Sequence, residues 1–126
     1  MTLLLNLRDQ VFRKKGILSS ELTMAMQLME ANILRNLSID EFAAKLNLSP
    51  ARLRFLFQEH LNTTPHRYLR ELRMRKAEQL LHQSDIRIRE VAAQCGYSSA
   101  VRFIHAFTAR HGISPRGYRI QLRKEQ

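Results

Sequence analysis

One sequence pattern occurs twice in this chain, and that repeat limits what the chain can fold into. Residues 39–68 and 88–118 each have an isoleucine, a glutamate two residues later, an Ala-Ala pair, and a final Pro-x-x-Tyr. The spacing between copies is first 49 and then 50, which places one extra residue near the start of the second copy's second helix. The matched pairs are Ile39 and Ile88, Glu41 and Glu90, Ala43 and Ala92, Ala44 and Ala93, Ser49 and Ser98, Arg52 and Arg102, Phe57 and Phe107, Pro65 and Pro115, and Tyr68 and Tyr118. A repeat of this length is typical of a supersecondary unit used twice.

Each copy is predicted to form a short helix, a turn and a longer helix, which together make a helix-turn-helix unit. In the first copy, Ser38 and Glu41 form a capping box that starts a helix. The Ser-Pro pair at positions 49–50 starts the next helix. The turn between the two helices requires left-handed backbone angles, which Asn47 tolerates in the first copy and Gly96 favours in the second.

No segment carries a strand pattern, so the sequence predicts an all-α fold. We expect about seven helices, with two helix-turn-helix subdomains joined by a long linker helix. The expected helices cover about residues 21–34, 39–46, 65–81, 88–95 and 99–111, with two more starting at 50 and 115. The expected divisions are an N-terminal extension or linker remnant (1–20), a first subdomain with the linker helix (21–81), and a second subdomain (82–126). Leu3, Leu4, Leu7 and Phe12 would give the extension a short amphipathic helix, and Ser20 would cap the helix that follows.

The charge of the chain indicates an anionic partner. Lysine and arginine total 21 against 11 acidic residues, and residues 38–126 hold 16 and 8 of them, so +8 of the +10 net charge lies in the repeated region. Most of the basic residues are arginines, whose planar fork fits phosphate and guanine. Ribosomal or membrane-surface binding would also suit a basic chain, but two helix-turn-helix units favour double-stranded DNA.

The sequence predicts no metal site, no cofactor and no enzymatic activity. Cys95 is the only cysteine, which excludes a disulfide framework, and we expect it to be a small buried apolar residue. The chain has no glycine-rich phosphate loop, and a predicted turn separates His60 from His66. No apolar stretch is long enough for a membrane span. These features are consistent with a reducing compartment, and we expect a cytoplasmic, nucleoid-associated protein.

The second helix of each copy can be phased from its apolar residues. Leu53, Leu56, Phe57 and Leu61 share one face, as do Phe103, Ala106 and Phe107, so the opposite faces point to solvent. In helix-turn-helix proteins these outward residues meet base edges in the major groove. The candidates for base readout are Ala51, Arg52, Arg54, Phe55, Gln58, Val101, Arg102 and His105. Arginine pairs with guanine and glutamine with adenine, whereas Phe55 and Val101 would contact thymine methyls or be ordinary exposed apolar residues.

Helix N-termini and arginines provide candidates for DNA-backbone contacts. Free N–H groups and the helix dipole attract phosphate at a helix start. The candidates at helix starts are Ser49, Thr64, Ser98, Ser99 and Ser114, and those on the basic rim are Arg67, Arg110, Arg116 and Arg119. The helix at 99–111 has few polar outward residues, which indicates that the second copy binds mostly backbone. If the linker helix holds the two recognition helices about 34 Å apart, they enter successive major grooves.

A second hypothesis keeps the fold but changes the partner. Phe55, Val101 and Ile104 are apolar residues on the predicted outer faces, so they would suit a helical protein-interaction module with only non-specific nucleic-acid affinity. RNA is disfavoured as the partner, because aromatic stacking platforms are missing.

The segment from Ile88 to Arg119 contains I-x-E-V-A-x-x-C-G-Y-x-S, F-x-x-x-F and G-I-S-P-x-x-Y-R. With the first copy, this makes residues 22–122 resemble the AraC/XylS family of bacterial transcription regulators. The resemblance implies two helix-turn-helix subdomains joined by a linker helix, and transcriptional activation through promoter DNA and RNA polymerase. Family members usually carry an additional sensing or dimerisation domain. This chain has no room for that domain, so we expect a stand-alone regulator or the C-terminal half of a longer one.

Overall fold

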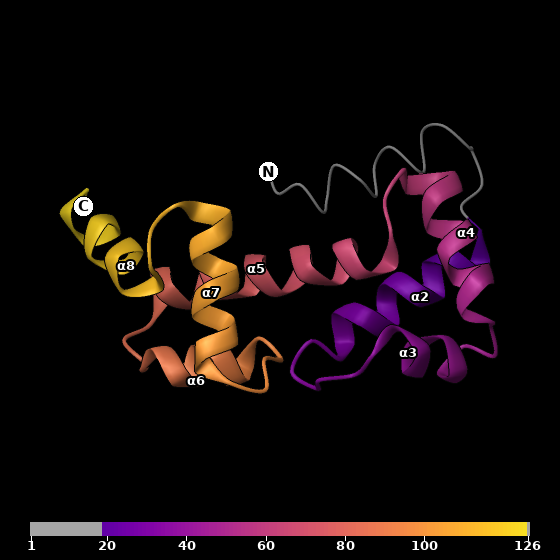
Figure 1. The fold of residues 1–126 in the computed structure, drawn as a ribbon, viewed down its shortest axis with the longest axis horizontal. Helices are drawn as coiled ribbons and strands as arrows, with labels where there is room; N and C mark the ends of the chain where they lie inside the picture. Colours follow the sequence, from indigo (N-terminus) through magenta and orange to yellow (C-terminus); the bar gives the residue numbers. More distant parts are fainter. Residues whose placement is uncertain (1–18, 126) are drawn as a thin grey trace. The chain divides into compact units, whose positions relative to one another are not determined.

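The computed structural model describes residues 19–125, and within this range it contains seven α-helices and no strand (Figure 1). The predicted all-α fold is therefore confirmed. The helices are α2 (Ser20–Ala31), α3 (Ile39–Lys45), α4 (Pro50–Leu61), α5 (Pro65–Gln83), α6 (Ile88–Gln94), α7 (Ala100–His111) and α8 (Pro115–Lys124). The apolar residues Leu3, Leu4, Leu7 and Phe12 of the predicted extension lie outside the described residues.

Serine and threonine side chains start the helices, largely as the sequence predicts. Ser38 accepts a hydrogen bond from the Glu41 amide at 3.1 Å, and its own amide donates to the Glu41 carboxylate at 3.1 Å, which completes the capping box. The first helix was predicted less well. Its cap is Ser19 rather than Ser20, and it ends at Ala31 rather than near residue 34. The Asn32 side chain donates to the Leu28 carbonyl at 2.8 Å, which satisfies a carbonyl left free at the helix end.

The structure aligns the two helix-turn-helix units as the sequence does, except at the serine before the second helix. Asn47 (φ 57°) and Gly96 (φ 84°) both adopt the expected left-handed conformation, 49 residues apart. The next amides, of Leu48 and Tyr97, still form equivalent bonds at that spacing. The cap of α4 is Ser49, however, and the cap of α7 is Ser99. The pairing of Ser49 with Ser98 is therefore wrong, because the extra residue lies in the turn before α7 and not inside the helix.

The chain forms two compact units that share α5. Among the described residues, unit 1 comprises 19–32 and 37–72, and unit 2 comprises 33–36 and 73–125. The long helix is continuous from Pro65 to Gln83, so its first turns belong to unit 1 and its later turns to unit 2. The division of α5 differs from the predicted limit at residue 81, which assigned the whole helix to the first subdomain.

Each unit has its own apolar core. The fully buried side chains of unit 1 include Phe42, Leu53 and Phe57, and the ring of Phe57 meets that of Tyr68 edge to face at 5.3 Å. The core of unit 2 consists of Met74, Ala77, Leu81, Val91, Ala92, Cys95, Phe103 and Phe107. Burial raises the pKa of the Cys95 thiol to about 12. Cys95 therefore packs as the small buried apolar residue expected from its position.

Two glycines with left-handed backbones give a matched test of packing around the turn of unit 2. A Cβ on Gly96 would lie 2.1 Å from the carbonyl oxygen of Ile33, whereas a Cβ on Gly112 (φ 72°) would have nothing within 4 Å. We expect Gly112→Ala to lower the free energy of unfolding by roughly 1–2 kcal/mol, the cost of the left-handed backbone. Gly96→Ala should cost at least about 1 kcal/mol more, because the carbonyl must move.

Urea unfolding of the two variants, followed by circular dichroism, measures both losses. Equal losses for Gly96→Ala and Gly112→Ala would show that the Ile33 carbonyl does not restrict position 96.

Candidate nucleic-acid interface

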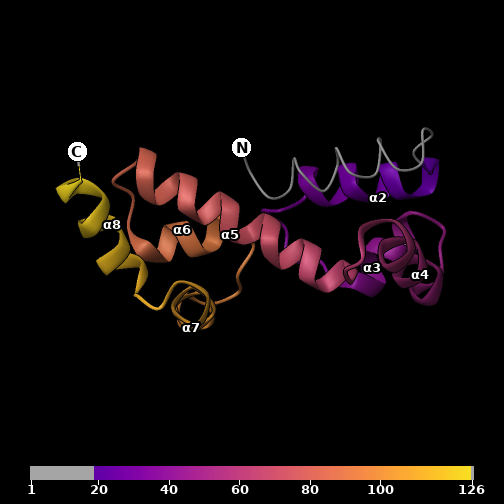
Figure 2. The ribbon, with the colours of Figure 1, turned by 90° about the horizontal axis from the view of Figure 1, so that it is seen from above.

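Each unit presents one helix of its helix-turn-helix pair at the surface. In unit 1, α4 runs across α3 after the turn at Asn47, and in unit 2, α7 runs across α6 after the turn at Gly96 (Figure 1). Figure 2 views α7 along its axis, at the edge of its unit. A helix held across its partner in this way, with one face free, is the arrangement that helix-turn-helix proteins use to enter a major groove.

The free face of α4 carries five of the eight residues predicted for base readout. Leu53, Leu56, Phe57 and Leu61 are buried, which fixes the rotation of the helix and leaves the opposite side in solvent. The exposed residues on that side are Ala51, Arg52, Arg54, Phe55 and Gln58. Phe55 is 54% exposed, so this face presents a large aromatic ring between two arginines.

The polar residues of α4 differ in how firmly they are held. Nη2 of Arg52 donates to Oε1 of Glu21 at 2.9 Å, and the guanidinium carbon lies 5.5 Å from the centre of the Phe55 ring. Gln58 donates to the Asn62 side chain at 2.9 Å, so its amide is engaged on the helix itself. Arg54 is exposed and forms no ion pair or side-chain hydrogen bond within residues 19–125. Arg54 is therefore the residue of α4 whose donors are all available to a ligand.

The free face of α7 is less polar. Val101, Arg102 and His105 are exposed as predicted, and Val101 is 62% exposed. Ile104, which the sequence predicts to flank this face, is partly buried, and its side chain packs against the core that contains Phe103 and Phe107. Ile104 occupies the position that Arg54 has in α4, so the second unit has a partly buried apolar residue where the first has an exposed cation.

The helix caps determine which backbone N–H groups can receive a phosphate. Four cap hydroxyl oxygens each accept a hydrogen bond, at 3.0–3.1 Å, from the backbone amide three residues later. The pairs are Ser49 and Arg52, Thr64 and Arg67, Ser99 and Arg102, and Ser114 and Gly117. Proline at the first position of α4, α5 and α8 has no N–H to offer. One free amide therefore remains in the first turn of each of these helices. In contrast, α7 begins with Ala100 and keeps two.

Ser98 precedes this arrangement and does not cap α7. It is exposed in the turn, and Ser99 makes the capping bond instead. Its predicted contact with the DNA backbone would therefore be through its own hydroxyl and not through a helix end.

The four arginines predicted for the basic rim fall into two groups. Arg67 and Arg116 are exposed. Arg119, in contrast, donates from Nη1 to the Ile86 carbonyl at 2.7 Å and from Nε to the Leu81 carbonyl at 3.4 Å. Its guanidinium joins α8 to the last turns of α5 and to the segment between α5 and α6, so the structure places it in a packing role that the sequence did not predict.

Arg110 belongs to a cluster around Glu78, whose side chain is only 17% exposed. Arg75 lies 3.2 Å from one carboxylate oxygen, and Arg110 and His111 lie 3.8 and 3.1 Å from the other. The His111 ring also stacks on Phe107, with ring centres 4.1 Å apart. This cluster attaches the end of α7 to α5 and draws Arg110 toward a carboxylate of its own unit, away from the role of a free phosphate ligand.

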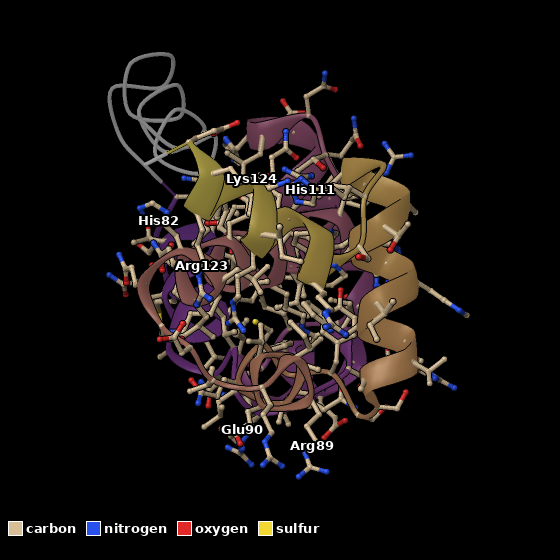
Figure 3. All side chains as sticks on the ribbon, turned by 90° about the vertical axis from the view of Figure 1, so that its left-hand side faces the viewer. His82, Arg89, Glu90, His111, Arg123 and Lys124 are labelled. Atoms are coloured by element: carbon tan, nitrogen blue, oxygen red, sulfur yellow. The ribbon has the colours of Figure 1, made fainter. Side chains whose placement is uncertain are left out.

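Several charged residues that the sequence analysis did not single out lie beside predicted ones. An open groove of about 460 Å³ is lined by Arg87, Arg116, Arg119, Arg123, Asp85, Ile88 and Ile120. Arg123 pairs with Asp85 across it, and Figure 3 shows Arg123 on α8, with Arg89 and Glu90 projecting from α6. Glu21 was also missed. No local pattern marks it, because its partner Arg52 lies 31 residues away.

Residues 19–125 contain no group of three or more histidine, cysteine, aspartate or glutamate side chains placed to hold a metal ion. In the same range, none of the helices combines the length and apolar character needed to cross a membrane.

Arg119 and Arg116 provide a test of the two kinds of arginine. We expect Arg119→Ala to lower the free energy of unfolding by roughly 1.5–3 kcal/mol, because two carbonyls lose a charged donor. Arg116→Ala should leave stability nearly unchanged, since its side chain is exposed. Thermal unfolding of both variants measures the difference. A stability loss in Arg116→Ala equal to that in Arg119→Ala would contradict the assignment of Arg119 to packing and of Arg116 to the exposed surface.

Comparison with known proteins identifies the family. Residues 42–121 match a family model described as a helix-turn-helix domain. The regulator ArgR of Pseudomonas aeruginosa is 38% identical over 120 residues, which are 94% of this chain and 36% of that protein. An AraC-type regulator structure from Chromobacterium violaceum is 39% identical with a TM-score of 0.72, covering 81% of this chain and 91% of that one. The DNA-binding domain of AdpA, in complex with a target DNA, is 26% identical with a TM-score of 0.80, covering 86% and 97%. The chain belongs to the AraC family of helix-turn-helix transcription regulators.

Proposed function

We propose that this chain is the sequence-specific, double-stranded DNA-binding part of a bacterial transcription regulator. The observation that supports this most is that two helix-turn-helix units each present a free helix face, and that every residue predicted for base readout is exposed. The DNA-bound AdpA domain has a similar fold. In this proposal, α4 and α7 insert into successive major grooves of one duplex, so a single chain has two recognition helices.

The two helices would divide the work unequally. The α4 face has two arginines and Gln58 to distinguish bases, while α7 has Arg102 and His105 beside the apolar Val101. Bidentate pairs with bases supply discrimination, whereas amide and arginine contacts to phosphate position the protein without reading sequence. We therefore assign most base readout to α4, and a larger share of backbone contact to α7 with its two free amides.

The finer functions rest on the relatives. A protein described as the transcriptional activator RhaR of Cronobacter sakazakii is 35% identical over 83 residues. This supports activation as the outcome of binding. We further propose, as the family resemblance implies, RNA polymerase as the protein partner, a cytoplasmic location at the nucleoid, and no enzymatic role. The chain spans about a quarter to a third of the length of curated relatives that it matches (36% of ArgR and 25% of GbdR). Effector binding and dimerisation in the whole regulator would then depend on parts outside this chain.

The alternative function, a protein-interaction module, has less support. It requires Phe55, Val101 and Ile104 as an outer apolar surface, but Ile104 is partly buried against the core of unit 2. Phe55 and Val101 are also in different units, so neither unit presents an apolar patch built from several of these residues.

Selection of bound sequences from random DNA duplexes tests the proposal directly. We expect a two-part site whose halves are about one helical turn, or 10–10.5 base pairs, apart. Enrichment of only one half of the site would mean that α7 contacts the DNA backbone and does not read bases. Salt-sensitive binding without any enrichment would contradict sequence-specific recognition by this chain.

Two variants separate readout from backbone contact on the selected site. Arg54→Ala should weaken binding to the selected duplex by roughly 1–3 kcal/mol and have much less effect on a random duplex. Arg116→Ala should weaken both alike and reduce the slope of log affinity against log salt by about one. Fluorescence anisotropy across a salt series measures both quantities. Equal losses on both duplexes for Arg54→Ala would contradict the assignment of α4 as the reader.

A further inference from the structure

Arg52 is constrained on two sides before any DNA arrives. It lies on the edge of the free face of α4 that adjoins α2, and Glu21, in the first turn of α2, accepts from its Nη2 at 2.9 Å. The guanidinium also lies 5.5 Å from the centre of the Phe55 ring. Both charged side chains remain largely in solvent, with exposures of 47% for Arg52 and 43% for Glu21.

These two contacts leave part of the guanidinium available. An arginine has five N–H donors in a planar fork, and the carboxylate of Glu21 uses a donor on one terminal nitrogen. The second terminal nitrogen forms no hydrogen bond or ion pair within the described part of the chain. A long side chain that is already held in one direction loses less freedom when it binds.

We propose that Glu21 is a specificity-determining residue, which acts by holding Arg52 along the Phe55 ring in position for one base or base step. This inference rests on the proposed function, because it requires a sequence-specific DNA site. Glu21 itself does not touch DNA in this proposal. It acts through Arg52, so it is a positioning residue supplied by a helix outside the helix-turn-helix pair.

The second unit shows what the arrangement looks like without this residue. The buried residues Leu22, Ala25 and Met29 of α2 correspond to Met74, Ala77 and Leu81 of α5, at a constant spacing of 52. The same spacing matches Glu21 with Arg73, a cation whose guanidinium lies 5.8 Å from the Tyr97 ring. Arg102, the counterpart of Arg52, has no ion pair within residues 19–125.

This difference has a functional consequence. The sequence repeat conserves an arginine at the third position of both recognition helices, but only the first unit pairs that arginine with a carboxylate. Arg52 is thereby prepared for one direction, whereas Arg102 is free to reach phosphates in many directions. In this proposal, Glu21 is the reason that α4 reads bases while α7 binds mostly the DNA backbone, and Glu21 lies outside the repeated sequence.

Binding of Glu21→Gln to the selected duplex and to a random duplex tests the proposal. Loss of a negative charge near DNA raises both affinities, so the informative quantity is their ratio. We expect the ratio of specific to non-specific affinity to fall roughly two- to five-fold, the range of an exposed ion pair. Asp40→Asn is the matched control. Asp40 is exposed in the first turn of α3, and its replacement by asparagine also removes one negative charge. Its ratio should equal that of the unaltered protein.

A double-mutant cycle with Arg52→Ala shows whether Glu21 acts through Arg52. In the Arg52→Ala background, Glu21→Gln should leave the affinity ratio unchanged. A ratio that falls equally in both backgrounds, or one that changes no more than in Asp40→Asn, would overturn the inference. If the unaltered protein shows no difference between the two duplexes, the proposed function fails instead, and that outcome is distinct from either result.

Discussion

The rotation of α4 and α7 about their own axes is the constraint on which the interface depends. It is set by burial of residues four positions apart, Leu53 and Phe57 in α4, and Phe103 and Phe107 in α7. Because a helix turns 100° per residue, anchoring these pairs in the core leaves one opposite face for a ligand. A polar substitution at either pair would destabilise the unit, because a buried polar group without a partner is costly.

Most of the fold could be predicted from the sequence, because its strongest signals are local. The capping box at Ser38 and the left-handed turns at Asn47 and Gly96 each depend on a few neighbouring residues. The same holds for the exposed faces, which follow from apolar periodicity. The end of α2 was misplaced because Asn32 closes the helix with its side chain, while the apolar pattern continues beyond it.

The details of the site were harder to predict, because they depend on contacts between distant segments. Arg119 was expected to bind phosphate, but it binds carbonyls at residues 81 and 86 that only the folded chain brings near. Ile104 has the same helical phase as Arg54, but it is partly buried because its side chain is apolar. The two copies thus share their left-handed turns and the serine caps of α4 and α7, while other side chains at equivalent positions differ in what they do: Ser38 caps α3, whereas Arg87 makes no side-chain capping bond to α6.

Burial of Cys95 has a practical consequence for studying the protein. It is the only cysteine of the chain, and its side chain has no exposed surface and a pKa raised to about 12 by burial. A thiol of this kind is a poor nucleophile at neutral pH. Spin labels or fluorophores can therefore be attached to a cysteine introduced at an exposed position such as Thr108, without first removing the native residue from the core. Pairs of such labels on the two units would report their separation on and off a duplex.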